Sequence, residues 1–434
     1  MEKLNEDFII NLSNNKGEPL WMKNFRLNSY KKFLELDNPS FGPKINIDFD
    51  NLVYHKGLFA PPSCSWENVD KKVKNTFNDL GVIEAENKYL KGVSNQYESE
   101  VVYHKMEESD GIIFLSTDEA LKKYPELFEK YFNNLVKYEE NKYTALNGAL
   151  WSGGSFIYIP PYTKVDRPLQ SYFRIDTKNL GQFERTIIIV DHDSSLHYIE
   201  GCTAKNYSTT SLHAGVVEIY VGKNSTCKYS TIQNWSKDVY NLVTKRAILE
   251  EGAYMQWVDG NIGSGVTMKY PSCILKGDNS KASSISIAYA KEGQHLDAGA
   301  KMIHLGKYTK SNIISKSIAS GGGNATYRGT VKITKNAIGS KASVKCDTLI
   351  LDDKSKSDTI PTNIVNNNSS FMEHEATVSK ISEDKLFYLM SRGLDEDKAK
   401  ELIIMGFISA FREELPTEYA VELNRLLAIN IGDK

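Results

Sequence analysis

FMEHEATVSKISEDKLFYLMSRGL, residues 371–394, decides the fold, because a long series of short strands gives way here to helices. In an extended segment successive side chains point to opposite faces, so Glu373 and Glu375 share one face and His374 points to the other. Carboxylates and imidazoles bind metals and carry protons. The short strand that opens this stretch therefore holds three candidate functional side chains.

The second half of the stretch has the signals of a helix. Ser382 precedes two acidic residues and an apolar run, which is typical of an N-cap, with the acids at the positive end of the helix dipole. We expect this helix to begin near Glu383 and to end near Gly393, as helices often end at a left-handed glycine.

Further apolar residues follow at helical spacing toward the C terminus. They form a first stripe of Ile404, Phe407, Ile408, Phe411 and Leu415, and a second, after Pro416, of Tyr419, Leu423, Leu426 and Leu427. We expect two helices here, which cap the last coil of the preceding structure or form a ridge for a partner.

Upstream of this stretch, the chain from Gly153 has the pattern of a mainly β protein. Eleven short segments rich in β-branched and aromatic residues are separated by small polar turns: SFIYIP, SYFRID, RTIIIV, VVEIYV, CKYSTIQNW, LVTKRAIL, AYMQWV, SISIAYA, KMIHL, ATYRGTVKIT and ASVKCDTLIL. No clear helical pattern interrupts them, which excludes an α/β fold. A sandwich, a barrel and a β-solenoid remain, and the spacing alone does not choose among them.

Residues 1–150 mix helix and loop signals. Aromatic and aliphatic residues recur at helical spacing from Trp21 to Leu34. Ser116 with Glu119 forms a capping box, and Pro125 is suited to the first position of another helix. These features indicate packing.

Composition and charge restrict the function. The 434 residues include 41% hydrophobic and 25% charged residues, and the formal net charge is -2. These values are ordinary for a globular protein and give no electrostatic reason to expect nucleic acid or a membrane surface as a partner. The sequence has neither an apolar run long enough to span a membrane nor a signal peptide. We expect a cytoplasmic protein, or one in an organelle whose genome encodes it.

The five cysteines, Cys64, Cys202, Cys227, Cys273 and Cys346, are scattered without a CxxC pair. This argues against a disulfide framework and against a self-contained cluster fold, which draws several thiolates from one loop. A metal cluster here would need ligands from distant residues or a second subunit.

Several long stretches resemble one family. EHEATVSKISEDKLFYLMSRGL, YPSCILKGDNS, KMIHLGKYTKSNIISK and YFRI are similar to SufB-type members of the SufB/SufD family, which act in the SUF system of iron–sulfur cluster assembly. The resemblance runs from about Trp21 to the C terminus. It implies a right-handed parallel β-helix core (residues 151–376), flanked by an N-terminal helical or mixed domain (1–150) and a C-terminal helical domain (377–434).

The resemblance also implies a cluster site. Cys346 lies in an alternating strand, in phase with Ala342, Val344 and Ile350, and by that pattern faces the core. It matches the family cysteine that lies with the glutamate matching Glu373 at a subunit interface, where the nascent cluster forms. Glu375 and His374 are further candidate ligands, and His374 is the less suited of them because it points to the other face of its strand.

A second set of residues matches the family's route for sulfur. Cys202 matches the cysteine that receives sulfur as a persulfide. The residues that match the lining of the route through the β-helix are Arg174, Gln233, Trp235 and Lys245. Asp176 stands where many relatives have asparagine, and an added negative charge there would oppose thiolate formation.

The resemblance implies a scaffold without catalytic turnover of its own, which holds a transient iron–sulfur cluster. Its expected partners are a SufC-like ABC ATPase on the C-terminal helices, SufD or a second SufB copy, and a sulfur donor such as SufE or SufU with a cysteine desulfurase. Whether a reduced flavin binds stays open. One departure is that the first cysteine is Cys64, so the chain lacks the N-terminal cysteine cluster of some relatives.

Two other functions are weighed against this one. A SufD-like structural subunit would need none of the matched cysteines, and the joint presence of Cys202, Cys346 and Glu373 favours the scaffold. A polysaccharide-processing β-helix enzyme would use clustered acids, of which Asp191-His192-Asp193 in a turn is the best candidate. Ser320-Gly321-Gly322-Gly323-Asn324 lacks the spacing of a phosphate loop, so we expect a turn.

Overall fold

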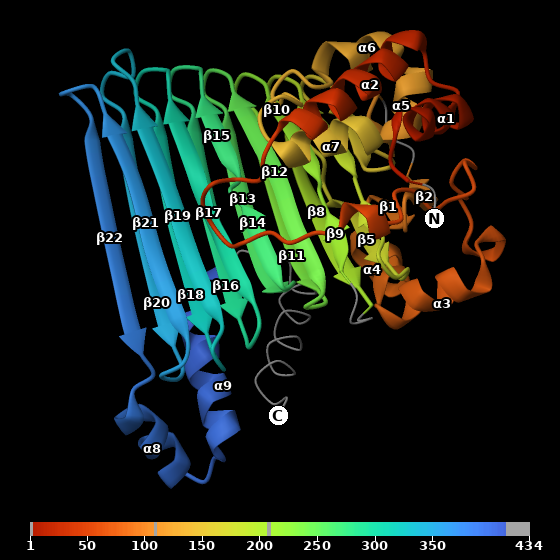
Figure 1. Cartoon of the computed structure of the whole chain (residues 1–434). Coiled ribbons are helices and arrows are strands. Elements are labelled where there is room, and N and C mark those ends of the chain that lie inside the picture. The colour runs from red at the N-terminus through yellow and green to blue at the C-terminus, as the bar shows by residue number, and fades with distance from the viewer. Residues whose placement is uncertain (1–2, 108–110, 206–209, 414–434) are drawn as a thin grey trace.

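The computed structural model describes residues 3–107, 111–205 and 210–413. Two long sheets run side by side along the molecule (Figure 1) and enclose a common core. The strands of the first sheet, in spatial order, are β2 (Glu100–Met106), β1 (Gly92–Tyr97), β5 (Leu169–Ile175), β8 (Ser195–Ala204), β11 (Thr226–Trp235), β13 (Tyr254–Gly263), β16 (Lys281–Ala290), β18 (Lys310–Ala319), β20 (Lys341–Ile350) and β22 (Phe371–Lys380).

The second sheet is ordered in the same way along the axis. Its strands are β21 (Lys356–Val365), β19 (Asn324–Ile333), β17 (His295–His304), β14 (Val266–Lys269), β12 (Val239–Leu249), β10 (Val216–Val221), β7 (Arg185–Val190), β4 (Ser155–Ile159) and β3 (Ile113–Ser116), with β15 (Ser272–Leu275), β9 (Ser211–His213) and β6 (Gly181–Gln182) beside this path.

The chain alternates between the sheets and pairs with itself one coil later. Lys281 lies opposite Lys310, which lies opposite Lys341, which lies opposite Phe371, and all these pairings are parallel. Consecutive strands of a sandwich built from hairpins would pair antiparallel. The predicted parallel β-helix is therefore confirmed, and the turn expected at residues 320–324 lies between β18 and β19.

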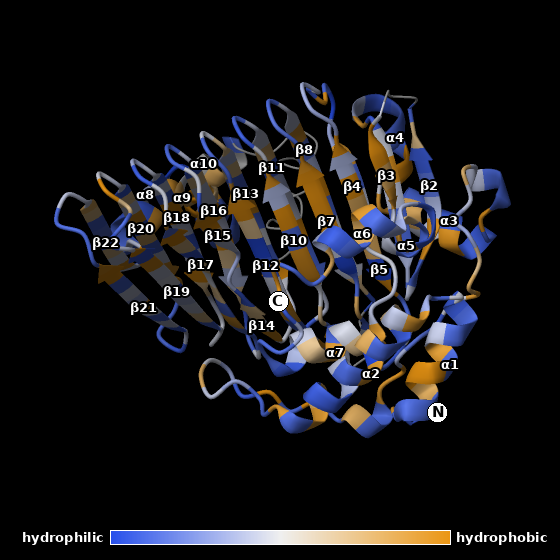
Figure 2. Ribbon diagram, turned by 90° about the horizontal axis from the view of Figure 1, so that it is seen from above, coloured by the Kyte–Doolittle hydropathy of each residue, from blue (hydrophilic) through white to orange (hydrophobic). Residues whose placement is uncertain are grey.

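The core between the sheets is apolar along most of its length. Tyr198, Tyr229 and Trp257 stack on successive coils of the first sheet and pack with aliphatic residues of the second. Hydrophobic strands and mostly hydrophilic turns are visible in Figure 2. This pattern follows from alternation, since inward side chains meet the opposite sheet.

The N-terminal region covers the first coils. Its helices are α1 (Glu6–Lys16), α2 (Leu20–Glu35), α3 (Lys71–Asp79), α4 (Val82–Tyr89), α5 (Thr117–Lys123), α6 (Pro125–Tyr131) and α7 (Lys142–Leu150), with short 3-10 turns at Phe49–Asn51 and Trp66–Asn68. The Ser116 cap and the start at Pro125 are confirmed. The region also supplies strands β1 to β3, which the sequence did not reveal; β1 joins β5 in parallel, whereas β3 pairs antiparallel with β4.

The C-terminal helices are α8 (Glu383–Ser391), α9 (Glu396–Phe407) and α10 (Ser409–Glu413). The Ser382 hydroxyl caps α8, and Gly393 adopts the left-handed conformation beyond its end, as expected. Ile404, Ile408 and Phe411 are fully buried. Burial of such side chains stabilises by roughly 1.5–3 kcal/mol each, which holds this segment against the solenoid.

The place of this stripe corrects one expectation. It packs on outward-facing isoleucines of the first sheet, among them Ile285, Ile287 and Ile318, and so covers the side of the solenoid rather than its last coil. The reason is that these strands carry large apolar residues at outward positions too. Leu415 and the helix expected after Pro416 lie outside the described residues.

The last coil is consequently open in a single chain. Strands β21 and β22 are the edges of the two sheets. Their exposed apolar side chains include Ile360, Ile364, Val365, Phe371 and Val378. An exposed edge strand with apolar residues is a surface that pairs readily with another chain.

Candidate functional site

A row of polar side chains follows the inside of the first sheet. The strand register places Glu200, Thr231, Asp259, Ser286, Ser315 and Cys346 on successive strands, all pointing inward. We call these six residues the interior polar row. Neighbouring strands lie about 4.8 Å apart, so the row spans roughly 24 Å from Glu200 to Cys346. Ser286 donates a hydrogen bond of 3.2 Å to Ser315, which links the middle of the row.

Cys202 lies beside the first member of this row. It is 1% exposed, and its Sγ is 3.7 Å from Glu200 Oε1 and 4.0 Å from Gln233 Nε2. Glu200 Oε1 also accepts a 3.0 Å hydrogen bond from Lys245 Nζ, which reaches across from the second sheet. The Tyr229 hydroxyl donates to the other carboxylate oxygen. Three residues predicted for sulfur transfer, Cys202, Gln233 and Lys245, therefore converge on one carboxylate.

The charges around this carboxylate set two protonation states. Burial opposes ionisation of Glu200, but the Lys245 ammonium and the Tyr229 hydroxyl outweigh it and hold the pKa of the carboxyl below its ordinary value. Burial raises the pKa of the Cys202 thiol well above its ordinary value, and the Glu200 and Glu184 carboxylates add to the effect. At rest Cys202 is a neutral thiol beside an ion pair.

Arg174 and Asp176, also predicted for the route, form a separate pair. Phe173 and Ile175 point inward, so the alternating Arg174 points out. Arg174 Nη2 lies 2.7 Å from Asp176 Oδ1, and Nη1 donates to Thr203 at 3.1 Å. The guanidinium thus counters the negative charge of Asp176, which was expected to oppose thiolate formation.

Trp235 is inside the solenoid but does not touch the sulfur of Cys202. Its ring packs on His213 with centroids 4.6 Å apart. Its Nε1 has no hydrogen-bond partner within the part of the chain that the structure describes. Trp235 therefore walls the site on the side of His213.

Sequence reasoning missed Glu200, the residue at the centre of the site. It also missed a buried polar cluster beyond Gln233 that contains Asn241, Lys269 and His213. The available signal was a charged or amide residue at an inward position of an alternating strand, as Glu200 is between Tyr198 and Cys202. A strand whose core-facing positions are polar indicates an interior site.

Cys346 lies at the other end of the row, at the penultimate strand of the first sheet. It is 3% exposed and faces the core, as its phase predicts. Its Sγ is 3.9 Å from His374 Nε2, and His374 Nδ1 is 3.2 Å from Asn363 Nδ2. Burial raises the pKa of Cys346 to about 12, although a hydrogen bond with the Tyr327 hydroxyl lowers it. Burial also lowers the pKa of His374, which favours the neutral imidazole that metals bind.

The order of the three candidates around Cys346 differs from the expectation. In the single chain His374 contacts Cys346, whereas Glu373 and Glu375 are exposed on the opposite face of β22, and Glu375 lies 3.4 Å from Lys345. The reason is the register, which places Val344 opposite His374 and so puts His374 inside. Glu373 and Glu375 are left facing outward, and their part in a cluster site stays a prediction.

The other cysteines do not join either site. Cys227 and Cys273 belong to the apolar core, where Trp257 Nε1 donates to Cys273 Sγ at 3.1 Å. Burial raises the pKa of Cys273 to about 12. Cys64 is exposed. These three thiols read as structural or incidental residues.

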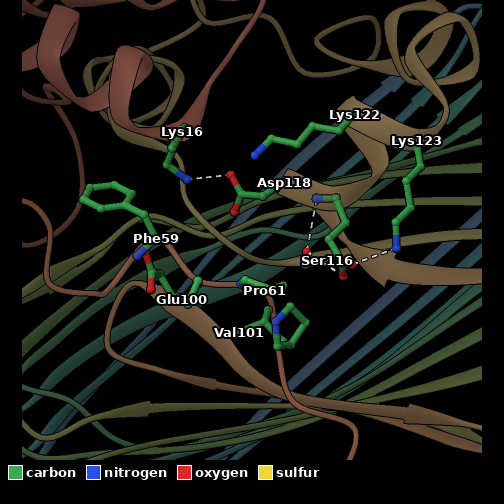
Figure 3. A pocket seen from close by; sticks show the side chains of 12 residues that line it. Lys16, Phe59, Pro61, Glu100, Val101, Ser116, Asp118, Lys122 and Lys123 are labelled. Carbon is green, nitrogen blue, oxygen red and sulfur yellow. Dashed lines mark hydrogen bonds and ion pairs between the residues drawn. The ribbon is translucent and has the colours of Figure 1, made fainter.

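A surface pocket of about 270 Å³ lies between α1, β2 and α5 (Figure 3). Its charged groups are mostly paired with one another, Lys16 with Asp118 at 2.5 Å and Lys123 with Glu119 at 2.9 Å. Its described lining contains no cysteine and no predicted site residue. The pocket therefore adds nothing to the cysteine sites. Among the described residues, no helix has the length and apolar character needed to cross a membrane.

Comparison with known proteins agrees with this geometry. Residues 173–407 match the family described as "SUF system FeS cluster assembly, SufBD core domain", and residues 68–171 match "SufBD protein N-terminal region". The chain is 54% identical over 428 residues to the iron-sulfur cluster assembly protein SufB of Bacillus subtilis, covering 98% of this chain and 92% of that protein. The chain belongs to the SufB/SufD family.

Other members of the family are equally similar. Iron-sulfur cluster assembly SufBD family proteins of Staphylococcus saprophyticus and Staphylococcus aureus are each 54% identical over 428 residues, with 98% of this chain and 92% of each relative covered. The core match begins at β5 and ends with α9, so it includes both Cys202 and Cys346. As a SufB/SufD family member, the chain is an iron–sulfur cluster assembly protein.

Proposed function

We propose that this chain is the scaffold on which a transient iron–sulfur cluster is built, with sulfur accepted at Cys202 and the cluster formed at Cys346. The interior polar row carries this proposal, because it connects the surroundings of the two cysteines inside a core that is otherwise apolar. Polar groups buried in a core cost stability unless they are hydrogen-bonded, so a continuous row of them calls for a functional reason.

Sulfur acceptance would take place by thiol exchange. The Cys202 thiolate attacks the outer sulfur of a donor persulfide, a new S–S bond forms, and the donor leaves as a thiolate. Lys245 and Lys269 favour the anionic forms of Cys202, and release of Lys245 from Glu200 would free its charge for the bound sulfur. Hydroxyl groups of Ser286 and Ser315 can donate to an anionic sulfur species that passes toward Cys346.

The cluster itself is cargo. A thiolate from Cys346 and an imidazole from His374 supply weaker ligation than four thiolates, which suits a cluster that must be handed on. Glu373 and Glu375 are proposed to act from the exposed face, as ligands shared with a partner. Reduction of persulfide sulfur to sulfide takes two electrons from a reductant outside this chain, for which a reduced flavin is the candidate.

Two surfaces support the proposed partners. The open edges of β21 and β22, with exposed Phe371 and Val378, would pair with SufD or a second copy of this chain. Exposed Phe387 and Tyr388 on α8 would contact a SufC-like ABC ATPase. The proposed units remain residues 1–150, 151–376 and 377–434, and the sulfur donor is of the SufE or SufU type with a cysteine desulfurase.

Two sulfur sources in one anaerobic assay test the proposal. With a desulfurase and cysteine, Cys202→Ser and Cys346→Ser should both fail to assemble cluster in the complete complex, and persulfide should accumulate on Cys202 of the second variant. With iron and free sulfide, Cys202→Ser should regain assembly while Cys346→Ser should not. Cys64→Ser is the matched control and should behave as the unaltered chain. Normal assembly by Cys346→Ser from both sources would refute the site.

A further inference from the structure

The side-chain amide of Gln233 is held in one orientation by two donors. Gln233 is 1% exposed, and its Oε1 accepts from Asn241 Nδ2 at 2.7 Å and from Lys269 Nζ at 2.9 Å. An ammonium group can donate hydrogen bonds but cannot accept them. The atom of Gln233 that faces Lys269 is therefore the oxygen, and Lys269 is kept in place by Asp259 at 2.8 Å.

The orientation of Asn241 is fixed from its far side in the same way. His213 Nδ1 lies 2.8 Å from Asn241 Oδ1, and His213 Nε2 lies 2.8 Å from Glu184 Oε2. Burial disfavours the imidazolium, but the Glu184 carboxylate outweighs burial and raises the pKa of His213. A protonated His213 donates at both nitrogens, so Asn241 must turn its oxygen to His213 and its nitrogen to Gln233.

The result is that the amide nitrogen of Gln233 points at the sulfur site. Nε2 lies 4.0 Å from Cys202 Sγ and 3.5 Å from Glu200 Oε1. We propose that Asn241 and Lys269 are positioning residues, which turn the Gln233 N–H toward an anionic sulfur on Cys202. This inference rests on the proposed role of Cys202 as sulfur acceptor and adds how the chain stabilises the thiolate or persulfide there.

The alternative orientation would be harmful. With the amide reversed, the carbonyl oxygen of Gln233 would face both the sulfur and the Glu200 carboxylate, and an anion at Cys202 would meet two acceptors and no donor. Hydrogen bonds to the charged form of a group favour that form. The two donors on Oε1 exclude this arrangement.

Other titratable groups also face Cys202 from every packed element. They are Tyr198 and Glu200 on its own strand, Tyr229 on β11, Asp259 on β13, His213 on β9, Lys245 on β12, Lys269 on β14, and Glu184 before β7. A test must therefore separate the effect of the Gln233 amide from direct effects of these charges. A double-mutant cycle through Gln233 does so.

The measurement is the pH profile of Cys202 modification by methyl methanethiosulfonate in the full chain, quantified on the Cys202 peptide by mass spectrometry. The thiolate displaces methanesulfinate and gains an S-methylthio group, so the rate follows the thiolate fraction. We expect Asn241→Leu and Lys269→Met each to move the profile up by about one pH unit, which is about tenfold slower at a fixed pH. Lys269→Arg retains donors and should restore most of the rate.

The cycle decides whether the residues act through Gln233. In a Gln233→Met background, Asn241→Leu should change the rate by less than about twofold. Asn147→Leu is the matched control: this asparagine is equally buried, and its amide donates to the backbone at Glu184 and Ala214. It should leave the profile unchanged.

Loosening of the fold would expose Cys202 and speed the modification, so slower modification marks the loss of positioning. Modification that is unchanged or faster in Asn241→Leu, or slowed equally with and without Gln233, overturns the inference. The reagent involves neither iron nor a sulfur donor, so this result stands apart from the proposed function. Should the profile shift as expected while the desulfurase delivers no sulfur to Cys202, the proposed function fails and the positioning role holds.

Discussion

Replacing Lys245 by methionine tests the ion pair that organises the Cys202 site. Lys245 Nζ and Glu200 Oε1 are 3.0 Å apart, and both side chains are 1% exposed. Removal of one partner from a buried pair typically costs 3–5 kcal/mol, because the remaining charge stays buried. Here the loss has an upper limit, since Glu200 can take up a proton.

This limit follows from the ordinary pKa values. Keeping Glu200 protonated at pH 7.5, three pH units above the ordinary value of 4.5, costs about 4 kcal/mol at about 1.36 kcal/mol per unit. In Lys245→Met the folded-state pKa of Glu200 is raised, so its contribution to stability is present below pH 4.5 and is lost as pH rises. The deficit relative to the unaltered chain should therefore shrink to below about 1 kcal/mol at pH 5.

Glu200→Gln should show the opposite dependence on pH. It leaves Lys245 buried beside Tyr229 without its main partner, and the neutral amine costs about 4 kcal/mol at pH 7.5 relative to the ordinary pKa of 10.5. A lysine with a lowered folded-state pKa loses stability as pH falls, so this deficit should persist or grow toward pH 5, within the 3–5 kcal/mol expected for an unpaired charge. The double variant, which buries no charge at this position, should lose much less than the sum of the two.

Urea unfolding followed by tryptophan fluorescence provides the assay, since Trp235 and Trp257 are buried in adjacent coils. The change in free energy follows from the midpoint and the slope of each transition. Deficits of the two single variants that change in the same direction with pH, or that add in the double variant, would refute the assignment of a mutually dependent buried pair.

Three further predictions concern the other end of the chain and its stability. In anaerobic reconstitution of the full complex, His374→Ala should lower cluster yield at least tenfold, and Glu375→Ala should do so only if the exposed glutamates act with a partner; iron content and absorption spectra measure both. Phe387→Glu should abolish co-purification with the ATPase without changing the circular dichroism of the core. His304 is buried, and burial lowers its pKa to about 4. Because the unfolded state then binds the extra proton, stability should fall by about 1.4 kcal/mol per pH unit below pH 6.5, and His304→Gln should flatten this dependence in urea unfolding.

The fold could largely be anticipated from the sequence, for local reasons. Alternation gave the inward phase of Cys346, and Ser382 capped its helix where its side chain predicted. The choice of a solenoid over a sandwich came from family resemblance, because a coil of about 30 residues repeats only in its alternation and shows no residue motif. Strands β1 and β3 escaped prediction since their pairing partners, β5 and β4, lie far along the chain.

The candidate site was less predictable, because it depends on register. Glu373 and His374 were correctly placed on opposite faces of one strand, but which face points inward depends on the length of the preceding turn. That single choice exchanged the neighbour of Cys346 from a carboxylate to an imidazole. Glu200 was overlooked for a related reason: a glutamate between apolar residues indicates an interior position only once Lys245 is known to lie opposite it.

The interior polar row explains why a solenoid suits a protein of this family. Parallel, in-register coils repeat each inward position at the strand spacing, so residues at one position of successive coils form a continuous line. In this chain the line is apolar at Tyr198, Tyr229 and Trp257, and two positions further along each strand it is polar. The apolar line supplies the burial that stabilises the coils. The polar line costs part of that stability and leaves two cysteines about 24 Å apart in one continuous environment, from a buried ion pair to the open last coil.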